Sequence, residues 1–366
     1  MDLVNATGMK ATFTMGLAPD GRESIVVVIK GTFLIPPRGG VAPLADKQDE
    51  FVFADTFTGK PGFSAVVYES DFAPIKPRCD VLLVGSAHAP RGRQVTGINV
   101  GLRVGSMVKG FEVVGDRHWT AGLLGVTATS PKPFSQMPIT YDRAFGGPGE
   151  ASQDDPALTN AYAPNPVGVG YFRRARDSDV FVKPLPNTHE TNDPVTSPNG
   201  AYRPMSFGPV GRNFAARIPL AGTYDQKWID QVFPFLPSDF QNDYYQAAPL
   251  DQQIPYPCGG EIVQLVHLTS HEQPPFQLPT VDMPVQFTDA AHNHTAQSAV
   301  LDTIVLAPDE GKMNLLWRTS LPLKRNIQEI AQVVIGYMPK GWYRARARGK
   351  RYYPSLGALA AARKAL

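Results

Sequence analysis

Hydrophobic residues in the first part of the chain form short runs and alternating patterns typical of β-strands. Residues 25–29 form a continuous apolar run, and the predicted strand 80–84 is apolar after Asp80, as expected of strands covered on both faces. Residues 98–104 alternate apolar with polar or small side chains, and the alternation continues over 108–113. Between them, residues 105–106 are Gly-Ser, a two-residue turn that favours positive φ at its first position. This pattern predicts a β-hairpin with a defined register.

Later segments predict further strands and two short helices. Strands are expected over 261–268 and 281–287, and a second hairpin should join 302–306 to 313–318. A helix is predicted over 225–233, with Asp225 as its N-cap and four apolar side chains at helical spacing. Residues 355–366 are rich in alanine and predict a short helix that would be marginal alone.

The predicted fold class is mainly β, with antiparallel, sandwich-like sheets, long Pro/Gly-rich irregular segments and a few short helices. The division expected along the chain is a β-rich half over 1–145, an irregular segment over 146–212, a second β-rich half over 213–338 and a basic tail over 339–366. Residues 146–212 hold ten of the 35 prolines, which cannot donate to a ladder. Because this segment also carries many aromatic side chains, we expect it to be ordered and packed on the sheets.

Composition favours a cytoplasmic protein without structural disulfides. At 366 residues the chain can bury a substantial core, and its only cysteines are Cys79 and Cys258. No apolar run approaches the roughly 20 residues of a membrane-spanning helix, and no secretory signal opens the chain. We therefore expect no membrane insertion.

Motifs of common enzyme and nucleotide-binding sites are missing from the sequence. No serine has glycines two residues to either side, and no phosphate-binding Gly-Lys-Ser/Thr loop occurs. His267 and His271 would lie roughly 13 Å apart along a strand, too far to share one zinc ion. His292 and His294 could chelate, but they stand in a polar stretch. We expect no metal and no cofactor.

A carbohydrate-active hydrolase is the alternative enzymatic hypothesis. Glycosidases need two carboxylates at a fixed separation. Five aspartates between residues 225 and 251 stand among aromatic side chains that could line a sugar cleft: Asp225, Asp230, Asp239, Asp243 and Asp251. The simpler interpretation is that the aromatics belong to the core and the aspartates cap helices and turns.

The tail after Glu329 contains eight Lys or Arg and no Asp or Glu, whereas the rest of the chain is net acidic. As a strand, residues 342–353 would present three guanidiniums on one face, suited to carboxylates or phosphates. The candidate partner-binding residues are Arg344, Arg346, Arg348, Lys350 and Arg351. Alternatively, these side chains pair with the acidic body and solubilise an edge strand. Nucleic acid is the less favoured partner, because the acidic body would repel it.

Charges of both signs crowd between two predicted strands near residue 75. They are Glu69, Asp71, Lys76, Arg78 and Asp80. Charges that enter a core must be paired or hydrogen-bonded. We therefore predict a structural charge network that fixes the turn at residues 73–77.

The segment Tyr68–Pro90, YESDFAPIKPRCDVLLVGSAHAP, closely resembles a bacterial family of type VI secretion effector adaptors, also known as domain of unknown function 2169. Further blocks follow in the family's order at residues 141–147, 165–168, 185–187, 207–212, 222–225, 233–240 and 247–253. The resemblance implies a cytoplasmic, non-catalytic adaptor or chaperone. Such a protein binds a toxin effector, often through its N-terminal region, and loads it onto the spike tip protein. No catalytic residues come with the resemblance.

Overall fold

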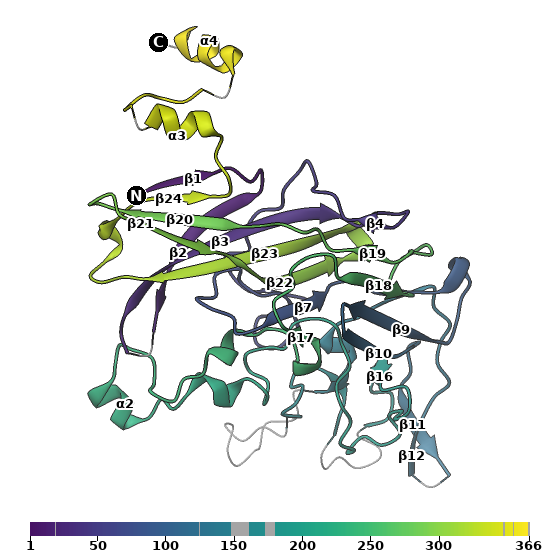
Figure 1. The fold of residues 1–366 in the computed structure, drawn as a ribbon. Helices are drawn as coiled ribbons and strands as arrows, with labels where there is room; N and C mark the ends of the chain where they lie inside the picture. Colours follow the sequence, from purple (N-terminus) through teal and green to yellow (C-terminus); the bar gives the residue numbers. More distant parts are fainter. Residues whose placement is uncertain are drawn as a thin grey trace. The chain divides into compact units, whose positions relative to one another are not determined.

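The structure is a computed structural model that describes residues 1–18, 20–123, 125–147, 161–172, 180–346, 348–353 and 355–364. The chain is mainly β, as predicted (Figure 1). It forms two compact units: unit 1 comprises Met1–Gly8, Asp282–Ala299 and Gln328–Leu366, and unit 2 comprises Met9–Val281 and Val300–Ile327. This grouping differs from the linear division expected above, because late strands pair with early ones.

Unit 1 is built on a four-stranded mixed sheet. Its strands, in spatial order, are β1 (Asp2–Asn5), β24 (Ile330–Ile335), β20 (Pro284–Asp289) and β21 (His294–Ser298). The first two are parallel, and the other neighbours are antiparallel. The strand predicted over 281–287 corresponds to β20.

The longest strands of unit 2 form a six-stranded sheet. Its spatial order is β17 (Gln253–Ile254), β7 (Cys79–Leu83), β22 (Val300–Ala307), β23 (Lys312–Pro322), β3 (Glu23–Leu34) and β2 (Lys10–Leu17). The pair β7–β22 is parallel and the other neighbours are antiparallel. The predicted strands at 25–29 and 80–84 and the hairpin at 302–318 are confirmed. Ile25 to Ile29 are fully buried, as expected of a strand covered on both faces.

A second six-stranded sheet of unit 2 contains the other predicted hairpin. Its order is β16 (Thr188–His189), β10 (Met107–Val114), β9 (Gly97–Val104), β18 (Ile262–Val266), β19 (Phe276–Gln277) and β4 (Gly40–Val41). Val104 pairs with Met107 across the two-residue turn, and Gly105 has φ +57°, so the predicted register and turn are confirmed.

Short elements complete unit 2. The two-stranded ladders are β5 (Thr56–Phe57) with β6 (Val66–Tyr68), β8 (Ser86–His88) with β13 (Gln136–Pro138), β11 (Trp119–Gly122) with β12 (Gly125–Ala128), and β14 (Phe145–Gly146) with β15 (Val169–Gly170). The 3₁₀ turns η1 (Pro90–Gly92), η2 (Tyr141–Arg143), η3 (Ile218–Ala221), η4 (Asn242–Tyr245), η5 (Leu250–Gln252) and η6 (Pro308–Glu310) lie between strands, and η7 (Ile327–Glu329) precedes β24.

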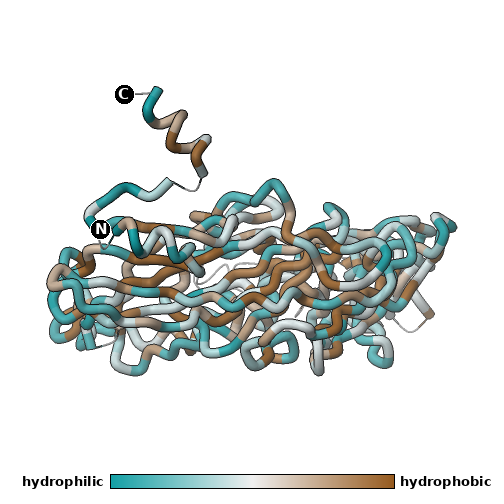
Figure 2. Tube along the Cα trace, turned by 45° about the horizontal axis from the view of Figure 1, so that its top comes forward, coloured by the Kyte–Doolittle hydropathy of each residue, from teal (hydrophilic) through white to brown (hydrophobic). Residues whose placement is uncertain are grey.

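Figure 2 shows hydrophobic residues concentrated along the strands and hydrophilic residues in many of the connections. A separate cluster buries Trp119, Phe145 and Leu185 against aromatic side chains from the Pro/Gly-rich segment. Part of that segment, residues 148–160 and 173–179, lies outside the described residues. In its described part, Phe207 is fully buried, and its ring centroid lies 4.6 Å from that of Phe111 with the rings tilted by 39°.

The predicted internal helix is present as α2 (Gln226–Gln231). Asp225 caps it, because its carboxylate accepts a hydrogen bond from the Trp228 amide at 2.8 Å. The apolar side chains of this helix do not enter the core, contrary to the simpler interpretation of the sequence. Ile229 is 54% exposed and Phe233, just beyond the helix, is 65% exposed.

The conformation considered for the basic residues of 342–353, a strand, is not the one observed. Lys340–Arg346 forms helix α3, and alanine and arginine both favour helix. Arg344 and Arg346 therefore project about 200° apart around the helix, and the predicted row of guanidiniums does not form. The last predicted helix is present as α4 (Leu356–Lys364). No helix in the described ranges is long and apolar enough to cross a membrane.

Candidate functional site

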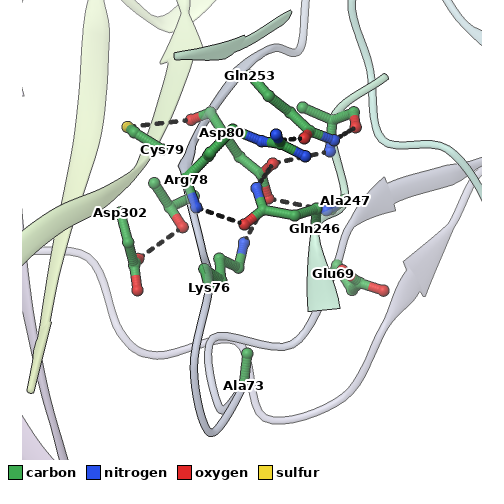
Figure 3. A network of polar contacts seen from close by, with 12 residues as sticks. Glu69, Ala73, Lys76, Arg78, Cys79, Asp80, Gln246, Ala247, Gln253 and Asp302 are labelled. Carbon is green, nitrogen blue, oxygen red and sulfur yellow. Dashed lines mark hydrogen bonds and ion pairs between the residues drawn. The ribbon is translucent and has the colours of Figure 1, made fainter. Parts of the chain in front are cut away.

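The carboxylate of Asp80 is the centre of a buried polar network (Figure 3). It accepts hydrogen bonds from Lys76 Nζ at 2.7 Å and from Gln246 Nε2 at 2.6 Å. The backbone amides of Ala247 and Ala248 donate to it at 2.8 and 3.2 Å. Asp80 is fully buried and lies on β7. Its hydrogen bonds therefore connect residues 246–248, directly after η4, to the six-stranded sheet that contains β7.

Lys76 stays charged inside this network. Burial alone would lower its pKa, but the nearby carboxylates of Asp80, Asp302 and Glu69 outweigh burial, and the pKa of Lys76 is raised. Its side chain is only 6% exposed. The pair with Asp80 is therefore a desolvated ion pair that depends on both partners.

Arg78 fastens the outer edge of the same network. Its guanidinium donates from Nε to Gln253 Oε1 at 2.9 Å and pairs with Asp243 at 2.7 Å. Its backbone amide donates to Gln246 Oε1 at 3.0 Å. The side chains of Arg78 and Asp243 are both more than 40% exposed, so this ion pair is much weaker than that of Asp80.

The two remaining predicted residues bind other partners. Asp71 pairs with Lys30 at 2.9 Å in the interior. Glu69 pairs with Arg217 at 2.9 Å and with Arg212 at 2.8 Å. Burial would raise the pKa of Glu69, but the two guanidiniums outweigh it and the pKa is lowered.

Several members of these contacts were missed from the sequence. Arg318 pairs with Asp302 at 2.6 Å and donates to the carbonyls of Asp71 and Ala73 at 3.0 and 2.7 Å. Arg318 thereby holds the start of the turn at residues 73–77. The sequence pattern predicted instead that charges closer in the sequence would fix this turn. The sequence did contain one signal for such buried cations: a Lys or Arg inside or at the end of an apolar strand. Lys30, directly after the run 25–29, is an example.

A cavity of about 300 Å³ adjoins these ion pairs. Its lining includes Tyr68, Leu316 and the paired side chains of Lys30, Lys76 and Arg318. Every Asp, Glu, Lys and Arg in the described lining has an oppositely charged partner within 4 Å. The lining holds five acidic and four basic side chains, and Asp49 and Glu310 share Lys312, so its charges are nearly balanced within the protein.

Each aspartate of the glycosidase hypothesis is bonded to another group of the protein. Asp225 caps α2, Asp230 accepts from Gln226, and Asp239 accepts from Thr223. Asp243 and Asp251 pair with Arg78 and Arg203. Hydrogen bonds from Thr223 lower the pKa of Asp239, the opposite of what a general acid needs.

The four histidines considered as metal ligands are divided between the units. His267 and His271 belong to unit 2, and His292 and His294 belong to unit 1. His294 Nδ1 is 3.0 Å from Thr288 Oγ1, and His267 Nδ1 is 2.8 Å from the carbonyl of Asn99. Within the described ranges, no three His, Cys, Asp or Glu side chains are placed to hold a metal ion.

The candidate basic residues of the tail lie on α3 and in the segment directly after it. In the described part of unit 1, none of Arg344, Arg346, Arg348, Lys350 and Arg351 forms an ion pair. Arg346 lies over the Trp342 ring at 5.1 Å and Arg351 over the Tyr353 ring at 5.6 Å. Their role in partner binding stays a prediction.

An exposed apolar surface around α2 is the feature that sequence reasoning missed. The α2 patch consists of Tyr224, Trp228, Ile229, Phe233 and Phe235. The Trp228 ring contacts Tyr224 at 4.7 Å and Phe233 at 5.6 Å, and its Nε1 donates to the carbonyl of Phe235 at 3.0 Å. Four of the five side chains, all but Trp228, are 43–65% exposed. This arrangement holds aromatic rings in fixed positions without burying them.

Charged side chains at the α2 patch are mostly acidic. Asp225 and Asp230 are exposed, and each is bonded to a neutral group rather than to a cation. Lys227 is the basic residue within the helix. A partner at this surface would meet apolar rings beside a small excess of negative charge.

The chain belongs to the bacterial family described as "Uncharacterized protein conserved in bacteria (DUF2169)", whose model matches residues 20–318. No curated protein and no solved structure matches the chain. The matched range includes Asp80 and the whole α2 patch.

Proposed function

Because the chain belongs to this bacterial family, we propose that it is a cytoplasmic, non-catalytic adaptor that binds a toxin effector and loads it onto the type VI secretion spike. The resemblance of its sequence blocks to effector adaptors supports the secretion system and the two partners. The α2 patch supports protein binding, independently of that resemblance.

The α2 patch is the observation that carries the proposal. Contiguous exposed apolar surface on a folded protein commonly marks a contact site, and interface hot spots are rich in Trp and Tyr. Phe233 is 65% exposed although it contacts Trp228, so its ring is oriented before any partner arrives. Binding such a surface costs little side-chain entropy.

The charges around the patch specify the chemistry of the cargo. Asp225 and Asp230 would favour a cargo segment that carries Lys or Arg next to apolar side chains. The polar network around Asp80 supports a scaffold role for the charged residues, because each of them is bonded to another group of the protein. The glycosidase alternative gains no support from the geometry of the five aspartates.

Affinity purification of the tagged chain from its native cell, with mass spectrometry of the eluate, tests the proposal. We expect a secreted toxin and the spike protein to co-elute in stoichiometric amounts. The double substitution Ile229→Ser and Phe233→Ser should remove the toxin and leave the melting temperature unchanged. The matched control is Leu250→Ser, since Leu250 is 78% exposed but outside the patch. Normal loading of the toxin in cells that lack the adaptor would refute the proposal.

A further inference from the structure

The edges of the two six-stranded sheets of unit 2 are unequal. Three of the four edge strands, β17, β16 and β4, are two residues long. The fourth, β2, runs for eight residues, Lys10–Leu17, and pairs with β3 on one side. Short edge strands are a common means by which proteins avoid unwanted strand pairing. That protection is absent at β2.

The sequence of β2 also lacks the other protective features. Its register with β3 continues from Lys10 to Leu17 without a bulge, and it contains no proline. Lys10 is its one charged residue, and Glu50 neutralises it at 2.6 Å. The outer edge of β2 is therefore a flat, nearly uncharged row of backbone donors and acceptors.

The side chains of β2 leave apolar surface open at this edge. Phe13 and Met15 are 38% and 41% exposed. They lie on the same face of the strand, because they are two residues apart. Ala11 and Leu17 share that face and are partly exposed. A strand added here would cover this apolar row as well as satisfy the backbone.

We propose that β2 pairs with β2 of a second copy of this chain, antiparallel and about a two-fold axis at Thr14. In this register Phe13 of each copy lies opposite Met15 of the other, and Ala11 lies opposite Leu17. The two-fold axis keeps the apolar faces of both strands on the same side of one continuous sheet.

The sequence of β2 is complementary to itself in this register, which favours a second copy of the chain as the partner. Sulfur–aromatic contacts between Phe13 and Met15 form twice, once on each side of the axis. Lys10 lies opposite residue 18 of the partner strand, an alanine, so no like charges face each other. Because one strand pair forms a small interface, we expect association in the micromolar range or weaker.

Sedimentation equilibrium of the full chain, from micromolar to near-millimolar concentration, tests the pairing. We expect a reversible monomer–dimer equilibrium that the double substitution Phe13→Lys and Met15→Lys abolishes. The control is Val108→Lys, because Val108 is 71% exposed but stands on β10 in the other six-stranded sheet, away from β2. A wild-type chain that is monomeric at every concentration, or a dimer that survives the double substitution, would overturn the proposal.

The register is tested by crosslinking, which also covers the case in which the lysine variant fails to fold. In a Cys258→Ser background, Thr14→Cys should form an intermolecular disulfide, since opposite Cα atoms in an antiparallel pair are about 4.5–5.5 Å apart. Thr12→Cys should crosslink far more slowly. Crosslinking at residue 12 and not at residue 14 would show that the register is wrong.

This inference does not depend on the adaptor function. Hydrogen exchange separates the possible occupants: protection of residues 10–17 should rise with the concentration of the chain alone. Protection that appears with purified cargo and never with the chain alone would exclude a second copy as the occupant.

Discussion

Replacement of Asp80 by alanine should be the most destabilising single change in the polar network. It removes the carboxylate partner of Lys76, whose side chain is 6% exposed, and leaves the amides of Ala247 and Ala248 without their acceptor. Removing one partner of a buried ion pair costs about 3–5 kcal/mol. Unit 2 has about 300 residues, for which 1 kcal/mol corresponds to roughly 1.6 °C, so the melting temperature should fall by roughly 5–8 °C.

Urea unfolding followed by tryptophan fluorescence measures the loss. The matched control is Asp230→Ala, an exposed aspartate that bonds one glutamine and should change stability by about 0.5 kcal/mol or less. The double substitution Asp80→Leu and Lys76→Met should recover part of the loss, because an apolar pair can replace a buried ion pair. A cost below about 1 kcal/mol for Asp80→Ala would refute the reasoning, because exposed pairs cost that much.

Three further predictions concern Arg78, Lys109 and the C-terminal tail. Arg78→Ala should lower the free energy of unfolding by only about 1 kcal/mol, because its ion pair with Asp243 is over 40% exposed; unchanged stability with lost effector binding would instead assign Arg78 to the partner surface. Burial lowers the pKa of Lys109 to about 8, against 10.5 in the unfolded chain, so the unfolded state binds more protons between these values and stability should rise with pH there. Urea unfolding at several pH values should show that rise in the wild type and its loss in Lys109→Met. Deletion of residues 340–366 should leave the melting temperature unchanged, since α3 and α4 bury no residue; a fall of several degrees would show that the tail supports the fold.

Local signals were sufficient for much of the fold. The hairpin at Gly105 and the helix cap at Asp225 each depend on only a few neighbouring residues, and both are present as predicted. The charge cluster at residues 69–80 was also visible, because charges between apolar strands need partners. The partners of these charges could not be predicted, because Gln246 lies 166 positions from Asp80 and Arg318 lies 247 positions from Asp71, and no local pattern joins them.

The errors have a common physical cause. Alternation of Arg and Ala after Trp342 is compatible with a strand, but a strand also needs a neighbouring strand to pair with. The segment instead follows the helical preference of Ala and Arg and forms α3. Likewise, Trp228, Ile229 and Phe233 at helical spacing indicate one apolar face but not what covers it. Burial is a property of the whole fold, so an exposed apolar face has the same sequence pattern as a buried one.

The order of strands in the large sheet has a consequence for synthesis on the ribosome. β22 and β23 lie between β7 and β3, yet they are made more than 200 residues after β7. Until residue 322 has been translated and released, the fully apolar stretch Ile25–Ile29 has only β2 as a neighbour in its sheet. The nascent chain thus carries an aggregation-prone strand through most of its translation, and its yield in the cell should depend on factors that protect unfinished chains.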